Sequence, residues 1–449
     1  MSITKDLKIN AQSTAIDAII VCIALWPVWH WLGMRYIDTS DESYGWLALG
    51  FIAIFLYKKG RGFYCKNSDY IIITLLLLIY SLFYSQIPML LRAILTFSAL
   101  AVFASRTIYN RPFNFPLWGL FMLSLPVDAT LQFYIGFPLR LSSSNIAGLV
   151  LNLSNIHVQV NGGIMQFGKM AVAVDAPCSG VKMLYVTALL VCLIAVYNNL
   201  NFIRTALLAL AGLLVLIFAN SLRAAWLFFP ESGLVFAKHK ALIHDITGII
   251  AFSIILASIY GVNLLLNQLK KPLNLLAPPK QNSHPVNLKI RILLFIICAT
   301  TLMGSFRRQT HSIPKLNIAI PTTWNNKPLT QLPLTTQERT FQHNFPGVII
   351  KATDGINSYI FRFVNTKTRK LHSATDCFKG LGYKITYQPL EQNEQGTWSV
   401  FYAHKGPYHK KIKEIIIDKS GRNWSDLSKW YWTAPNSKLW TNIVIIETI

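Results

Sequence analysis

Long apolar runs follow one another along residues 1–304, and short segments rich in Lys and Arg separate them. A run of about 20 apolar residues lets a helix cross the bilayer with every backbone group paired inside the segment. The composition agrees with membrane insertion, because 53% of the 449 residues are hydrophobic and only 14% are charged. These values exclude a soluble enzyme and a disordered chain. Basic residues placed between apolar runs also argue against a nucleic-acid-binding protein.

The apolar runs predict a polytopic α-helical membrane protein with about eight or nine transmembrane helices. The segment 136–153 is ambiguous, because Arg140 and the serines at 142–144 interrupt it. No long apolar run follows residue 304, so we expect residues 305–449 to form a soluble α/β or β-rich domain. The expected spans are 14–33, 44–57, 70–84, 87–104, 113–127, 181–199, 205–221, 244–266 and 290–306.

Lys and Arg in the short loops set the expected orientation, because they concentrate on the cytoplasmic side. With the N-terminus inside, the first outer loop contains Arg35 with Asp38, Asp41 and Glu42 and is net acidic. The segments 128–180 and 222–243 and the C-terminal domain then lie on the outer side. Lys238 and Lys240 are exceptions, because basic residues are expected on the cytoplasmic side. We expect an inner-membrane protein with its C-terminal domain in the periplasm. The inner loops are 58–69, 105–112, 200–204 and 267–289.

One outer segment has the pattern of strands rather than of a helix. Apolar and polar residues alternate from Ile156 to Val160, and Asn-Gly-Gly follows at 161–163, so 155–175 predicts a β-hairpin. The hairpin leads to Cys178, directly before an apolar helix. Backbone N–H groups at a helix start lower a thiol pKa and can hold an oxyanion. At this point Cys178 is either a nucleophile or part of an ordinary turn.

Two further polar residues are expected at the depth of Cys178 on the outer face. Arg223 lies at the end of one apolar helix, and His244 opens the next. Each alone has a bland interpretation, Arg223 as a snorkelling side chain and His244 as an interfacial histidine. Together with Cys178 they match nucleophilic catalysis, since histidine is the usual base for a thiol and a fixed cation can hold an oxyanion.

Other polar residues leave alternatives open. Asp17, Arg92 and Asp128 lie in or beside apolar spans, where ionisable groups are costly and often functional. They could line a transport path, or Asp17 could pair with Arg92. A transporter or export component for an envelope polysaccharide is therefore one rival hypothesis, and a non-catalytic membrane scaffold is another.

The remaining cysteines favour packing over chemistry. Cys22, Cys192 and Cys298 lie in apolar spans and are expected to pack as small apolar residues. Cys65 is expected to be a free surface thiol in an inner loop. A disulfide between Cys178 and Cys377 has no support in the spacing.

Three blocks resemble the signature blocks of the exosortase/archaeosortase family. They are Ala-Pro-Cys-Ser-Gly-Val at 176–181, Asn-Ser-Leu-Arg at 220–223 and His-Asp-Ile-Thr-Gly at 244–248, within a likeness that covers about 70–266. The resemblance implies a membrane-embedded cysteine transpeptidase or protease. Its partners would be the lipid bilayer and membrane-anchored substrate proteins, each ending in a short motif, a transmembrane helix and a basic cluster. Cleavage would occur near the motif, outside the membrane.

Matching these blocks assigns a role to each residue. Cys178 becomes the nucleophile, Arg223 the stabilising cation and His244 the third catalytic residue. Asn220 and His239 are near enough in sequence to support them. The resemblance implies no metal or organic cofactor.

The C-terminal part carries a second resemblance. His372, Cys377, Gly380 and Gly382 are similar to the His–Cys–Gly–aromatic block of the exosortase-associated domain of exopolysaccharide loci, with Tyr383 where Trp is usual. The implied architecture is an exosortase-like membrane domain over 1–304 and an exosortase-associated domain over 305–449. This fusion resembles the exosortase N subgroup and implies a link to envelope polysaccharide.

Residue patterns predict several elements of the C-terminal domain. Asp426–Thr433 is expected to be a short helix or an aromatic patch for sugars or partners. His372 and Cys377 are a candidate metal or catalytic pair, or else a surface histidine and a packed cysteine. The expected strands are 348–352, 358–364, 396–404, 413–418 and 443–448.

Overall fold

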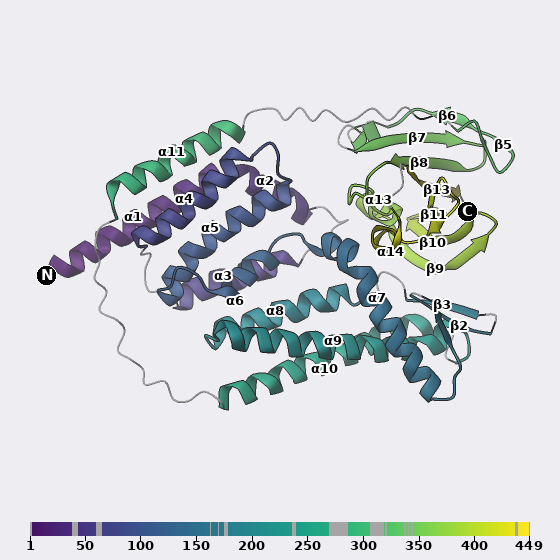
Figure 1. Ribbon diagram of the computed structural model, residues 1–449, viewed down its shortest axis with the longest axis horizontal. Coiled ribbons are helices and arrows are strands. Elements are labelled where there is room, and N and C mark those ends of the chain that lie inside the picture. The colour runs from purple at the N-terminus through teal and green to yellow at the C-terminus, as the bar shows by residue number, and fades with distance from the viewer. Residues whose placement is uncertain are drawn as a thin grey trace.

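A helical part and a sheet part make up the computed structural model (Figure 1). The structure describes residues 2–37, 44–59, 65–161, 163–168, 170–174, 178–235, 239–268, 286–305, 318, 321–335, 338–339, 341–342, 345–435 and 439–448. The helices are α1 (Ser2–Ala24), α2 (Trp26–Ile37), α3 (Gly45–Lys59), α4 (Asn67–Leu82), α5 (Met89–Tyr109), α6 (Phe115–Leu123), α7 (Asp128–Leu153), α8 (Val181–Tyr197), α9 (Phe202–Glu231), α10 (Lys240–Gln268) and α11 (Leu288–Ser305).

Within the described ranges, three helices are long and apolar enough to cross a membrane, namely α5, α9 and the 242–268 segment of α10. The number rises to five if the bent pairs α1–α2 and α6–α7 each count as one span, with bends of 67° and 103°. The expected count of eight or nine spans is therefore not supported. At 1.5 Å per residue, the 15 residues of α3 and the 16 of α4 reach only about 22–24 Å, against a core of about 30 Å.

The bends explain part of this difference. The apolar run 14–33 breaks at Leu25, and the run 113–127 ends as a helix at Leu123, shortly before Pro126. Proline has no N–H to continue a helix, so the chain turns there into α7. The ambiguous segment 136–153 is helical and forms about the last two thirds of α7.

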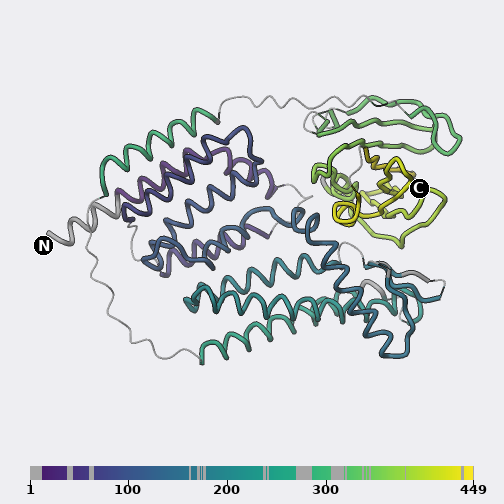
Figure 2. Tube along the Cα trace, in the orientation of Figure 1, coloured from purple at the N-terminus to yellow at the C-terminus, as the bar shows by residue number. Residues whose placement is uncertain are grey.

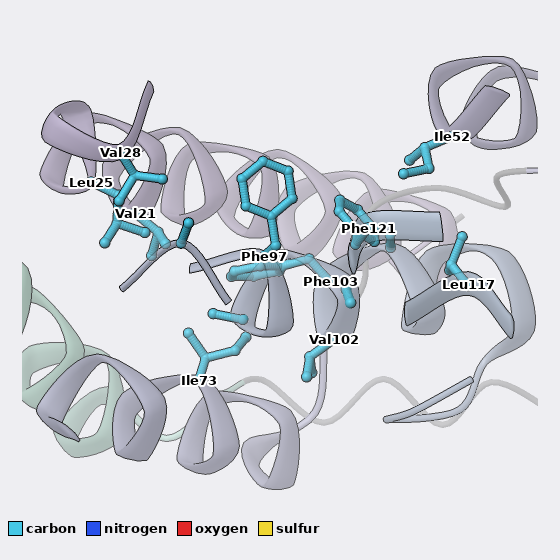
Figure 3. Packing of buried hydrophobic residues seen from close by; sticks show 14 of the residues in the cluster. Val21, Leu25, Val28, Ile52, Ile73, Phe97, Val102, Phe103, Leu117 and Phe121 are labelled. Carbon is cyan, nitrogen blue, oxygen red and sulfur yellow. The ribbon is translucent and has the colours of Figure 1, made fainter. Parts of the chain in front are cut away.

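Two apolar clusters hold the helices together. The larger one joins α1–α6, α8 and α11, and Figure 3 shows Val21, Phe97 and Phe121 among its side chains. The Phe97 and Phe121 rings meet edge to face with centroids 5.9 Å apart. The second cluster fills the space between α8, α9 and α10. It packs together the three helices that carry the expected catalytic residues.

Buried charges correct one of the sequence expectations. Asp17 does not pair with Arg92. Its carboxylate accepts bonds from the Nε and Nη2 atoms of Arg291 at 3.0 and 2.7 Å, and from the hydroxyl of Tyr70. Arg92 instead donates to the carbonyl of Ile87 and lies over an aromatic ring. The sequence could not show that α11 packs against α1 and α4, which brings Arg291 to Asp17.

Cysteine positions give a further correction. Cys65 is 1% exposed and packs in the larger apolar cluster, so it is not a surface thiol. No disulfide joins Cys178 and Cys377 in this structure.

A small antiparallel sheet precedes Cys178. Its strands are β1 (Gln159–Asn161), β2 (Ile164–Phe167) and β3 (Met170–Ala173), in the order β1-β2-β3. The predicted hairpin is therefore a three-stranded meander. Met165 and Val172 pack with Phe228 near the end of α9, so the meander covers the same end of the helices that Cys178 approaches.

The C-terminal part is β-rich. The large sheet has the order β6-β7-β8-β13-β11-β10-β9, with β12 paired to β11. All five predicted strands are present, and Asp426 caps a short helix as one alternative proposed. The elements are β4 (Thr323–Trp324), β5 (Lys327–Pro328), β6 (Thr330–Leu332), β7 (Gly347–Thr353), β8 (Ser358–Val364), α13 (Ala374–Gly380), β9 (Lys384–Asn393), β10 (Gly396–Lys405), β11 (Tyr408–Asp418), β12 (Asn423–Trp424), α14 (Leu427–Thr433) and β13 (Trp440–Thr448).

Strand β9 was missed because Pro389 interrupts its pattern. Proline cannot donate to a ladder and is confined to edges and bulges. β9 is the last strand of the sheet path, and its pairing with β10 shifts register between Trp398 and Val400, opposite the proline. Both conditions that permit proline are met at this position.

The sheet part docks on α7 through α14. Pro138 lies inside α7 and has no N–H, so the carbonyl of Tyr134 one turn earlier loses its helical donor. The indole Nε1 of Trp432 donates to that carbonyl at 2.6 Å. Nearby, the backbone N–H of Phe137 donates to Ser428 Oγ at 3.0 Å, and Arg140 pairs with Asp426. Figure 2 shows the sheet part at the end of the molecule where α7 lies.

The hydrogen bond from Trp432 to the Tyr134 carbonyl gives a stability prediction. Trp432→Phe removes the donor and leaves the Tyr134 carbonyl unpaired. We therefore expect the free energy of unfolding to fall by about 1 kcal/mol. In a Pro138→Ala background the new N–H supplies the carbonyl, and the same change should cost much less. Thermal unfolding of the purified protein in detergent measures both. Trp226→Phe, at another exposed tryptophan (57%), is the matched control. Equal losses in the two backgrounds would contradict the assignment.

Candidate active site

Three helices bring the predicted catalytic residues together. Cys178 lies just before α8, Arg223 lies in the last third of α9, and His244 lies near the start of α10. Cys178 Sγ is 3.5 Å from His244 Nε2, and Arg223 Nη2 is 2.8 Å from the same nitrogen. The structure thus brings the three predicted residues together at one end of α8, α9 and α10.

The bond from Arg223 determines the protonation of His244. A guanidinium is always charged and only donates, so Nε2 must present its lone pair and the ring is neutral. The ring proton is then on Nδ1, which lies 3.6 Å from the carboxylate of Asp245. The basic nitrogen thus faces the thiol. The side chain of Asp245 is 79% exposed, so its interaction with the imidazole ring is weak.

A polar network fixes the Cys178 loop. Asn220 is 2% exposed, and its Nδ2 donates to the carbonyl of Cys178 at 3.1 Å and to Ser143 Oγ at 2.9 Å. Ser179 Oγ donates to Gln132 Oε1 at 2.9 Å. Gly180 has φ +83°, and a Cβ there would lie 3.0 Å from the Asn220 amide, so both backbone and space require glycine.

The network includes two residues that sequence reasoning missed. Gln132 and Ser143 lie eleven positions apart on α7, which is three helical turns and one face. Uncharged polar residues at that spacing were the available signal. Asn220 supports the site as suggested. His239 is exposed before α10, and no hydrogen bond joins it to the catalytic group among the residues described.

Arg223 has bonding capacity that the protein leaves unused. The residue is only 8% exposed, and within the described part of the chain its Nε has no hydrogen-bond partner. A buried N–H without a partner is costly and calls for an acceptor. Space lies beside it, because a Cβ added at Gly248 would meet only this Nε, at 3.9 Å.

A second Cys–His pair lies in the sheet part. His372 Nε2 is 3.0 Å from Cys377 Sγ, at the start of α13. No group of three or more His, Cys, Asp or Glu side chains that could hold a metal gathers within the described ranges.

Comparison with known proteins covers the helical part. The model of the transmembrane exosortase family matches residues 14–261, a stretch that includes the Cys178, Arg223 and His244 blocks and ends before α11. No curated protein and no solved structure matches the chain. The matched stretch is more than half of the chain, and it contains the convergent site. This protein belongs to the transmembrane exosortase family.

Proposed function

We propose that this protein is a membrane-embedded cysteine transpeptidase or protease. Its substrates would be membrane-anchored proteins that end in a motif, a transmembrane helix and a basic cluster. The observation that carries the proposal is the Cys178 thiol 3.5 Å from the basic nitrogen of His244, which the buried Arg223 also contacts. Membership of the exosortase family supports the same reaction class.

The first step transfers a proton and releases Arg223. When His244 Nε2 takes the proton of the Cys178 thiol, that nitrogen becomes a donor and can no longer accept from Arg223. The Nη2 atom is then free beside a new thiolate. The ion pair between guanidinium and thiolate favours the charged state that attacks.

The second step forms a bond between the carbonyl carbon and the Cys178 sulfur and breaks the peptide C–N bond. The thiolate adds to the substrate carbonyl, and the oxyanion accepts from Arg223 through Nη2 and the unused Nε. On collapse, the C–N bond breaks and the His244 imidazolium gives its proton to the leaving amine. The substrate tail departs and a thioester remains on Cys178. Water or an amine then adds to the thioester, His244 takes the proton of this acceptor, and the thiol is restored.

Basic residues support an orientation with the site outside. Lys59 Nζ donates to the carbonyl of Tyr197, and the hydroxyl of Tyr109 donates to that of Val196, so the ends of α3, α5 and α8 meet. Cys178 lies at the opposite end of α8. Because basic loops favour the cytoplasm, we place the catalytic end in the periplasm of an inner-membrane protein.

The sheet part would lie on that same outer side. It docks on α7, the helix whose Gln132 and Ser143 hold the Cys178 loop. The block around His372 and Cys377 supports an exosortase-associated domain of the exosortase N type, linked to envelope polysaccharide. A transport path is less well supported, because Asp17, one of the residues that could line it, forms an ion pair with Arg291.

Labelling of Cys178 tests both orientation and activation. In spheroplasts, a charged maleimide that cannot cross the membrane should modify Cys178, because the site faces outward. His244→Gln removes the base and should slow this reaction about tenfold or more. Mass spectrometry quantifies the label, with Cys377 as the internal reference. Modification of Cys178 only after lysis would reverse the orientation, and an unchanged rate in the variant would remove His244 from activation.

Loss of the thiol should abolish processing. Cys178→Ala is expected to leave tripartite-tail proteins at full length in cells, because no acyl-enzyme can form. Immunoblots of such a substrate measure the effect. Cys192→Ala, in the following helix α8, and Asp128→Asn should process normally. Normal processing by Cys178→Ala, together with loss of function in Asp128→Asn, would favour the hypothesis of a polysaccharide transporter.

The space beside Arg223 should be needed by the substrate. Gly248→Val fills it with two methyl groups and is expected to reduce processing about tenfold or more, since a carbonyl can no longer reach Nε. Maleimide labelling of Cys178 should stay normal, because a small reagent needs less space. Gly261→Val is the matched control, as a Cβ there meets nothing within 4 Å. Unimpaired processing by Gly248→Val would contradict the assignment.

A further inference from the structure

The thiol–imidazole pair of the sheet part has the geometry of a reactive site. Besides its contact with Cys377 Sγ at 3.0 Å, His372 lies with Nδ1 3.1 Å from the carbonyl of Lys370. A carbonyl only accepts, so Nδ1 carries the proton and the basic Nε2 faces the sulfur. Cys377 itself is exposed. The pair therefore combines an oriented base with an accessible nucleophile.

A buried charged network holds the backbone from His372 to Ala374, at the start of the helix that carries Cys377. Arg362 and Glu414 are 4% and 5% exposed and form an ion pair of 2.8 Å. Arg362 Nη1 donates to the carbonyl of His372 at 2.8 Å. Glu414 accepts from Ser373 Oγ and from the backbone N–H of Ala374, at 2.7 and 3.1 Å. The network thus clamps the start of the segment between the histidine and the cysteine.

The cost of that network indicates what it is for. Two buried charges need a full set of partners, and here the amide of Asn442 completes it by bonding to both. Apolar side chains of the same size would stabilise the sheet as well or better. Unlike apolar side chains, the charged network also bonds to the backbone, and so it fixes the backbone at His372 and at the start of α13. Such preorganisation is what a reactive pair requires.

We propose that Cys377 and His372 form a second acyl-transfer site, which accepts acyl thioesters. Cys377 sulfur adds to the thioester carbonyl as its proton moves to His372 Nε2. The bond from carbon to the leaving sulfur then breaks, and that sulfur takes the proton back from the imidazolium. One thioester replaces another, so the step needs no oxidant, metal or water.

The surroundings favour a thioester over a peptide or an oxidant. The protein around the ring and the Arg362 guanidinium hold the pKa of His372 down at about 4. Although Cys377 is exposed, enough protein surrounds its sulfur to raise the pKa of the thiol. The pair is thus neutral, which disfavours oxidation, since oxidation requires a thiolate. A weak base suffices for a thioester, because a thiolate is a good leaving group.

The pair faces the helical part of the molecule. Arg35, at the end of α2, is among the cations that lower the pKa of His372. The pair therefore lies on the side of the sheet part nearest α2.

The test uses the full-length protein with Cys178→Ala in detergent, so that it is independent of the first site. S-phenyl thioacetate is the probe, and mass spectrometry measures acetylation of Cys377 at pH 7. We expect acetylation at Cys377 and a loss of about tenfold or more in His372→Ala. Added imidazole should restore the rate, which a purely structural histidine would not show. His404→Ala, at another histidine of the sheet, should change nothing.

Folding of the variant is checked on the same thiol. Alkylation of Cys377 by iodoacetamide at pH 10, where the thiol ionises without a base, should be equal in His372→Ala and its parent. No acetylation of Cys377 in the parent would overturn the proposal. So would equal acetylation rates with and without His372.

Discussion

The bond from Arg223 to the imidazole of His244 determines how this protein can react. A buried guanidinium must find an acceptor, and at 2.8 Å it has found the one nitrogen that also faces the Cys178 thiol. The ring is therefore neutral and its basic nitrogen is aligned before any substrate arrives. Proton transfer to that nitrogen breaks the bond and frees the cation. In the proposed mechanism, the base and the oxyanion donor are thus linked through a single atom.

Helix α7 connects this site to the rest of the molecule. On one face, Gln132 and Ser143 hold the loop of Cys178, directly and through Asn220. On another, the carbonyl that Pro138 leaves unpaired binds Trp432 of the sheet part. A change in how the sheet part docks would therefore act on the same helix that positions the nucleophile. This gives a physical reason for the two parts to be fused in one chain.

The sequence predicted the meeting of Cys178, Arg223 and His244 better than the membrane path. Cys178 precedes one apolar helix, Arg223 lies toward the end of the next, and His244 lies near the start of the third, so the alternating direction of the helices places them at one end. The number of spans depends on where helices bend, as at Leu25 and near Pro126, and apolar content does not show this. The partner of Asp17 depends on α11 returning to pack on α1, a contact between distant segments.

Smaller misses have equally local reasons. Strand β9 was not predicted because it contains Pro389. A bulge at the edge of a sheet tolerates proline, whereas a central strand excludes it. Gln132 and Ser143 became meaningful only once α7 was placed beside Asn220. His372 and Cys377 were named from a motif, but the clamp of Arg362 and Glu414 joins strands more than 50 residues apart in sequence.

The most direct test of the account is to trap the acyl-enzyme. The purified protein is mixed with a substrate protein that carries the tripartite tail, quenched in acid at a series of times, and digested for mass spectrometry. We expect the N-terminal part of the substrate to be joined to Cys178 through a bond that hydroxylamine cleaves. Cleavage of the substrate with no such adduct at any time, or with the adduct on another residue, would contradict the central claim.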